Sequence, residues 1–180
     1  MSDSWTIVKE IKDRLTSAVW SGVGGEAVFG NVLVSAGVDM EKVAGQLRWP
    51  FVLLLPDTME VDDEEPDLVT ARFTVLVAQR VAGDAWGESC LIGGAGPGTG
   101  LTSLGRGLME LEGILFNEIK LLGPTLGVTL QFIAASAIAA DLDPDNGYVA
   151  QRQYTFEAWT GAGDTTSYPI ASAPSIPPGF

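Results

Sequence analysis

Apolar residues recur at three- and four-residue steps in two stretches of the chain, residues 5–19 and 101–122. This spacing is typical of an amphipathic helix that buries one face. Ser4 stands at the N-cap position of the first stretch, and Thr102 or Ser103 stands at that of the second. We therefore predict two helices, the second of which is weakened by the glycines inside it.

Alternation of apolar and polar residues predicts several strands and is clearest over residues 68–80. Pro56 is expected to end the strand before it, because proline does not suit the interior of a central strand. Asn146-Gly147 is a strong hairpin-turn signal between the last two strands. The predicted strands are residues 27–35, 51–55, 68–80, 126–140 and 148–159.

The order of these elements predicts an α+β fold, because helices and strands mix without strict βαβ alternation. We expect a mostly antiparallel sheet with two helices packed on one face. Residues 1–160 are predicted to form a single domain, with a long Gly-rich loop at 82–100. Residues 161–180 are rich in proline and are predicted to form an extended C-terminal arm.

Charge narrows the classes of function. The chain has 23 acidic residues, 10 basic residues and no histidine, which gives a formal net charge of −13. A protein that grips nucleic acid shows a basic stripe, and this sequence has none. An acidic surface repels phosphate, so the charge is compatible with a protein that lies beside nucleic acid without binding it.

Catalytic and metal-binding residue types are scarce. The single cysteine, Cys90, cannot form an internal disulfide, which suits assembly in a reducing cytoplasm. With no histidine, most nucleophile–base pairs and most zinc or iron sites are excluded. We expect no enzyme and no cofactor. The sequence also lacks an apolar stretch of 18 residues and an N-terminal apolar region, so neither a membrane span nor a signal peptide is expected.

The stretch "AGPGTGLT" at residues 95–102 has part of the pattern of a phosphate-binding loop, G-x-x-x-x-G-K-[ST]. Gly100 and Thr102 match, but Ala95 replaces the first glycine and Leu101 replaces the lysine that contacts the outer phosphates. We interpret the stretch as a flexible loop that reaches a neighbouring subunit or a channel. A nucleotide-binding domain is the alternative from another class.

Alternating aspartates at Asp141, Asp143 and Asp145 could place oxygen atoms around calcium. An EF-hand loop needs glycine at its sixth position and glutamate at its twelfth. Asn146 and Arg152 stand there instead, and a hairpin turn explains these residues without a metal. The third hypothesis is a monomeric ligand-binding domain that binds calcium at this turn.

Surface residues in the loops and in the arm are our candidates for contact with other subunits. Trp86 lies in a polar loop with no obvious core to join, and exposed aromatic residues anchor interfaces. The acidic run "EVDDEEPD" is predicted to be a solvated loop that repels phosphate or attracts a basic partner. The predicted interface residues are Trp86, Gly96, Pro97, Gly98, Tyr168, Pro174 and Pro177, and the predicted acidic surface is Asp62, Asp63, Glu64 and Glu65.

Residues 4–160 resemble the tail terminator proteins, also called tail completion or minor tail proteins, of long-tailed bacteriophages. The resemblance rests on the order of the elements: a helix, strands, a long glycine-bearing loop, a long helix and a terminal hairpin. The segments that carry it are "WTIVKEIKDRL", "RWPFVLLLP", "ARFTVLVAQR", "GDAWG", "LGRGLMELEGIL" and "YVAQRQYTFEAW".

The resemblance implies a structural protein of the virion that is assembled in the host cytoplasm. Its subunits would form a homo-oligomeric ring, generally a hexamer, at the head-proximal end of the tail tube. The ring would end tube growth and join the tube protein to the head connector proteins, while DNA passes through without specific binding. The long glycine loop and the C-terminal arm depart from the family pattern. Another head–tail joining or tail-tube subunit is the alternative within this class.

Overall fold

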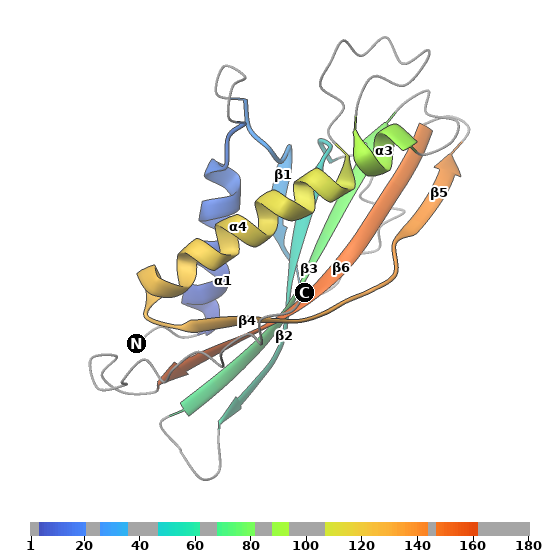
Figure 1. The fold of residues 1–180 in the computed structure, drawn as a ribbon. Coiled ribbons are helices and arrows are strands. Elements are labelled where there is room, and N and C mark those ends of the chain that lie inside the picture. The colour runs from blue at the N-terminus through green and yellow to red at the C-terminus, as the bar shows by residue number, and fades with distance from the viewer. Residues whose placement is uncertain are drawn as a thin grey trace, which may run out of the picture.

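Six strands form one mostly antiparallel sheet, and helices cover one of its faces (Figure 1). The computed structural model describes residues 4–20, 26–35, 47–61, 68–81, 88–93, 107–143 and 147–161. The helices are α1 (Ser4–Ser17), α3 (Glu88–Ile92) and α4 (Leu108–Leu126). The strands are β1 (Asn31–Val34), β2 (Phe51–Val61), β3 (Leu68–Val81), β4 (Thr129–Ala135), β5 (Ala139–Asp143) and β6 (Gly147–Gly161). The predicted α+β class with a mostly antiparallel sheet is confirmed.

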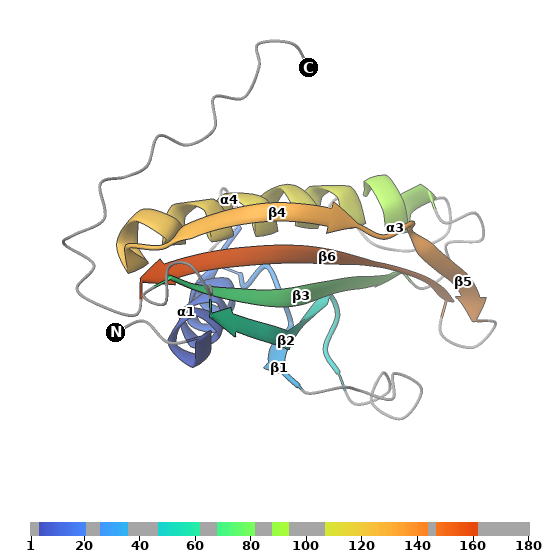
Figure 2. The ribbon, with the colours of Figure 1, turned by 90° about the horizontal axis from the view of Figure 1, so that it is seen from below.

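The strand order is β1-β2-β3-β6-β4, and β5 also pairs with β6 (Figure 2). Strands β1 and β2 run parallel, whereas every other recorded pair is antiparallel. The long strands β3 and β6 form the centre and pair from Leu68↔Gly161 to Val81↔Tyr148. Strands β5 and β6 form the hairpin that Asn146-Gly147 predicts, with Asp143 opposite Gly147.

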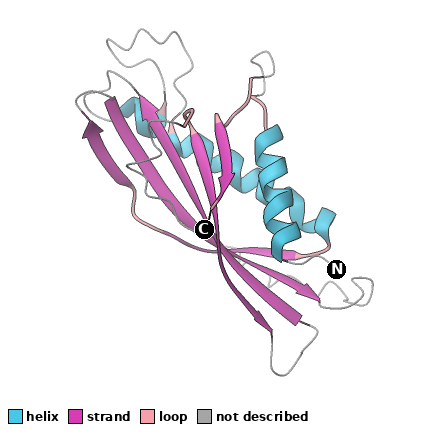
Figure 3. Ribbon diagram, turned by 180° about the vertical axis from the view of Figure 1, so that it is seen from behind, coloured by secondary structure: helices cyan, strands magenta, loops and turns pink. Residues whose placement is uncertain are grey.

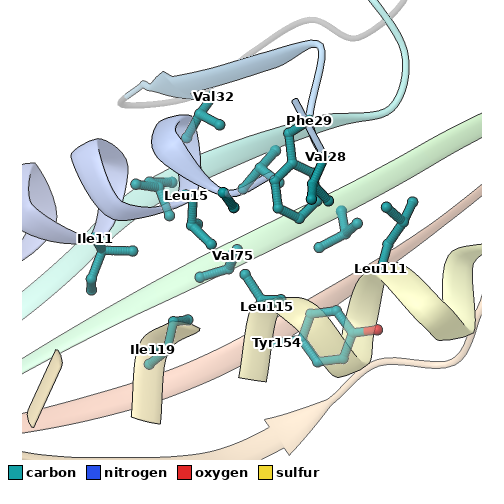
Figure 4. Packing of buried hydrophobic residues seen from close by; sticks show 14 of the residues in the cluster. Ile11, Leu15, Val28, Phe29, Val32, Val75, Leu111, Leu115, Ile119 and Tyr154 are labelled. Carbon is teal, nitrogen blue, oxygen red and sulfur yellow. The ribbon is translucent and has the colours of Figure 1, made fainter. Parts of the chain in front are cut away.

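Helices α1 and α4 pack on the same face of the sheet and bury the apolar stripe that the sequence pattern predicts. Val75 of β3 and Tyr154 of β6 lie beneath them (Figure 4). Alternation in β3 places Phe73, Val75 and Val77 toward the helices, as predicted. The helix residues at the centre of this core are Ile7, Ile11 and Leu15 of α1 and Leu111, Leu115 and Ile119 of α4.

Within the described residues, the second predicted helix is α4, which begins at Leu108 and continues past Leu122 to Leu126. Gly107 is the N-cap of α4, and its carbonyl accepts hydrogen bonds from the backbone N–H groups of Glu110 and Leu111. At the other end, Leu126 is the last residue of the helix, and Gly127 after it takes a left-handed conformation (φ 66°). Residues 101–106 lie outside the described part of the chain.

Two strand predictions and one loop prediction need correction. Pro56 does not end β2, which continues to Val61, because an irregularity in register between Pro56 and Met59 accommodates the proline. The single strand predicted at 126–140 is divided into β4 and β5. Within the predicted loop at 82–100, residues 88–92 form the short helix α3.

The division between β4 and β5 has a local cause at Ser136. Its backbone N–H donates to the Gln153 carbonyl, and its hydroxyl oxygen accepts from the Gln153 N–H at 3.2 Å. The side chain thus takes the place of a backbone acceptor, so that the chain leaves the regular ladder there. It rejoins β6 at Ala139, opposite Gln151.

Candidate functional site

The predicted site residues lie outside the described part of the chain. This holds for the predicted interface residues Trp86, Gly96, Pro97, Gly98, Tyr168, Pro174 and Pro177, and for the predicted acidic surface Asp62, Asp63, Glu64 and Glu65. The phosphate-loop pattern at residues 95–100 lies there too. These assignments therefore stay predictions, and the candidate site below is built from other residues.

Strand β4 forms one edge of the sheet beside α4 (Figure 2). Among the described residues it pairs with β6 alone, so its outer backbone N–H and C=O groups face away from the sheet. The register shifts between Phe132 and Ala134, which leaves Ile133 as an extra residue at the irregularity. Phe132 is 45 % exposed and Ile133 is 42 % exposed, so two consecutive large apolar residues of β4 lie at the surface.

A cluster of aromatic rings holds Phe132 in place. Its ring meets the Phe116 ring of α4 edge-on, with centroids 5.2 Å apart, and lies 5.8 Å from the Phe156 ring of β6. Phe116 also contacts Tyr154, and Phe156 stacks on Phe73 of β3. Contacts at these distances are favourable for aromatic pairs. The exposed Phe132 is therefore fixed against the core and does not project freely.

A small polar cluster lies beneath the middle of α4, next to the aromatic rings. The Arg152 guanidinium donates from Nε to the Ser136 carbonyl at 2.8 Å, and its Nη1 lies 3.6 Å from Glu112 Oε1. The Tyr154 hydroxyl is buried and has no hydrogen-bond partner among the described residues. Burial raises the pKa of Tyr154 well above its usual range, and the nearby Glu112 carboxylate adds to the rise.

This cluster has the features of a structural site. The Arg152 guanidinium interacts with two groups of the protein itself, the Ser136 carbonyl through Nε and the Glu112 carboxylate through Nη1. A shallow hollow of about 280 Å³ adjoins it, lined by Ser136, Ala137, Ala139 and the β6 residues 151–153. A second hollow of about 90 Å³ lies between α1 and the β2–β3 pair. In the described ranges, no three residues of the types His, Cys, Asp and Glu are grouped as metal ligands.

The face of the sheet opposite the helices is the other extended surface (Figure 3). At its β2 end, Phe51, Leu53 and Leu76 are buried, with Leu47 and Trp49 packed against them. On β3, β6 and β4 this open face carries three charged residues, of which Arg72 pairs with Glu157 and Arg80 lies over the Trp49 ring. The uncharged polar residues that these strands place on the same open face are Thr70, Thr74, Thr129, Gln131, Gln151, Gln153 and Thr155.

The β4 edge does not follow from the sequence pattern, because the pattern predicts one strand over residues 126–140 and does not fix its place in the sheet. One signal was available. Residues 121–140 contain no Asp, Glu, Lys or Arg, although the whole chain has a net charge of −13. A long uncharged segment in a strongly acidic chain marks a surface that is not adapted to free solvent.

No protein-family model matches the sequence, and no curated protein is significantly similar to it. In the part of the chain that the structure describes, no helix has the length and apolar character needed to span a membrane. The assignment of a function therefore depends on the surfaces described above and on the element order.

Proposed function

We propose that this chain is a structural subunit of a bacteriophage tail. Its copies would form a homo-oligomeric ring at the head-proximal end of the tail tube, where the ring ends tube growth and joins the tube to the head connector. The resemblance of residues 4–160 to tail terminator proteins supports this proposal, and so does the mixed α+β fold.

One observation carries the proposal furthest. Helices cover a single face of the sheet, and the opposite face over β6 and β4 presents mostly neutral polar side chains, with Glu157 paired to Arg72 of β3. Gln131 and Gln153 are exposed there, and Thr155 lies between them in the register. Proteins gain affinity for DNA when Lys and Arg side chains neutralise phosphates and displace the counterions of the DNA. A surface of neutral polar side chains therefore binds DNA weakly. We assign this open face to the wall of the channel through which DNA passes.

The same proposal gives roles to segments outside the described residues. The glycine-rich residues 93–100 and the arm at 161–180 would reach neighbouring subunits, and the tube protein and connector proteins would bind the two ends of the ring. Residues 62–65 would supply negative charge at a rim.

Size-exclusion chromatography with light scattering and negative-stain imaging test the proposal directly. We expect rings or larger assemblies when the protein is concentrated or mixed with tail tubes, and we expect those tubes to stop growing at a capped end. A chain that stays monomeric under all these conditions, and leaves tube length unchanged, would rule the proposal out. Saturable micromolar binding of ATP or GTP that is lost in Gly100→Ala would favour the nucleotide-binding alternative instead.

A further inference from the structure

We infer that the β4 edge is one half of the contact between copies of this chain, and that the β1 edge of the next copy is the other half. The two strands would pair antiparallel and continue the sheet from one copy into the next. This inference rests on the proposal that the chain forms a homo-oligomer.

The absence of edge protection on β4 is the first step. Exposed edge strands normally carry lysine, proline or an inward-pointing charge that prevents pairing with another chain. Strand β4 reads "TLQFIAA" and has none of these. Its irregularity would ordinarily protect an edge too, but the extra residue is Ile133, which is 42 % exposed.

The second step is the choice of a second copy as the occupant. Two chains of charge −13 repel each other over most of their surfaces, so they meet at least cost where each is uncharged. Residues 129–140, which include β4, provide one such surface, and residues 27–38, which include β1, provide another. A basic partner would gain nothing from either segment and would bind an acidic surface instead.

The topology makes the two edges compatible. Strand β1 forms the opposite edge of the sheet, and among the described residues it pairs with β2 alone. Counting directions across β1-β2-β3-β6-β4 shows that β4 runs opposite to β1. A copy placed beside β4 in the same orientation would therefore present β1 antiparallel to it, with helices on the same side.

Such a contact joins two different surfaces, so it propagates from copy to copy and closes into a ring if the rotation allows. Phe132, fixed by Phe116 and Phe156, supplies a rigid aromatic residue at the β4 side. On β1 the exposed apolar residue is Leu33, which is 36 % exposed and pairs with Leu53, so it lies on the open face of the sheet. A contact between two β4 edges would instead give a closed dimer.

Lysine substitutions at the two edges distinguish these arrangements. We expect Ile133→Lys and Leu33→Lys to be monomeric, by light scattering, at concentrations where the unmodified chain assembles. Leu121→Lys is the matched control, because Leu121 is 55 % exposed on α4 and lies on neither edge. Circular dichroism and thermal unfolding should show all three variants folded.

A mixture of the two edge variants gives the most direct test, because Ile133→Lys retains an intact β1 edge and Leu33→Lys retains an intact β4 edge. We expect a one-to-one dimer that grows no further. Assemblies that survive both substitutions would overturn the edge contact and leave the ring proposal standing. If Leu33→Lys assembles normally and the mixture gives no dimer, a β4–β4 contact is indicated and our inference is wrong.

Disulfide trapping covers the case of a weak contact. A chain with Leu33→Cys and Ile133→Cys should give a ladder of cross-linked species on mild oxidation, whereas Leu33→Cys with Leu121→Cys should give none. The native Cys90 is buried and can stay in place. An unmodified chain that never assembles, together with a double-cysteine chain that gives no ladder, would contradict both the edge contact and the ring.

Discussion

Phe132 of β4 packs edge-on against Phe116 of α4, with ring centroids 5.2 Å apart and ring planes at 85°. The contact joins the exposed edge strand to the long helix, and both rings also contact Phe156 of β6. It is thus the point at which a residue of the candidate assembly edge is coupled to the hydrophobic core.

A double-mutant cycle on this pair should show that coupling. We expect Phe116→Ala and Phe132→Ala each to lower the free energy of unfolding, Phe132→Ala the less because its ring is 45 % exposed. The interaction energy should be about 0.5–1.5 kcal/mol, as for other edge-on aromatic pairs. Urea unfolding of the four chains measures it. Strictly additive changes would mean that the two rings stabilise the fold independently.

Two glycines of the α4 region should respond to alanine in opposite ways. A Cβ at Gly113 meets nothing within 4 Å, so Gly113→Ala should stabilise the helix by about 0.5–1 kcal/mol. At Gly107 a Cβ would overlap the backbone of Ile92 and Gly93, where α3 ends against the start of α4. Gly107→Ala should therefore lower the melting temperature clearly, and thermal unfolding of both variants tests the contrast.

The sequence predicted the parts of the fold that depend on periodic burial. The alternation in β3 and the helical stripe in α4 both appear as expected, because each pattern is fixed by which face meets the core. The glycine at position 107 was less predictable, since the backbone of α3, distant by many residues, creates the need for it.

Prediction was weaker where tertiary contacts decide. The run 128–140 has no glycine or proline, yet the strand divides at Ser136, because that side chain bonds to Gln153 of another strand. Nor could the exposure of Ile133 be foreseen, because it depends on β4 being the last strand of the sheet. The interface residues and the acidic surface that the sequence predicts lie outside the described ranges, so they stay predictions.

Arg152 should be a stabilising residue through its effect on Glu112, whose side chain is 14 % exposed. Removing the arginine leaves this carboxylate largely buried without its cation, so Arg152→Met should lower the free energy of unfolding by about 1–3 kcal/mol. The double variant Arg152→Met/Glu112→Gln should recover part of the loss, because the stranded charge is gone. Equal stabilities of the single and double variants in urea would argue against this role.

Tyr154 should make the fold sensitive to alkali. Burial raises its pKa in the folded chain above the usual value of about 10, so the unfolded chain loses the phenolic proton first. The stabilising contribution is complete below that value and is lost as the pH rises above it. We expect the melting temperature to fall more steeply between about pH 9 and 11 than in Tyr154→Phe. Tyr154→Phe should cost little at pH 7, because the buried hydroxyl has no partner among the described residues.

Charge placed on the open face should bind DNA inside the assembled ring. Gln131→Lys/Gln153→Lys adds two cations to exposed positions of β4 and β6. We expect tighter binding of a short DNA duplex, with the slope of log affinity against log salt steeper by about 2, since each phosphate contact contributes about 0.9. The matched control is Asn117→Lys/Thr125→Lys, at exposed positions of α4 on the helical side. Fluorescence anisotropy over a salt series compares the pairs, and an equal increase in the control would show that the open face does not line the channel.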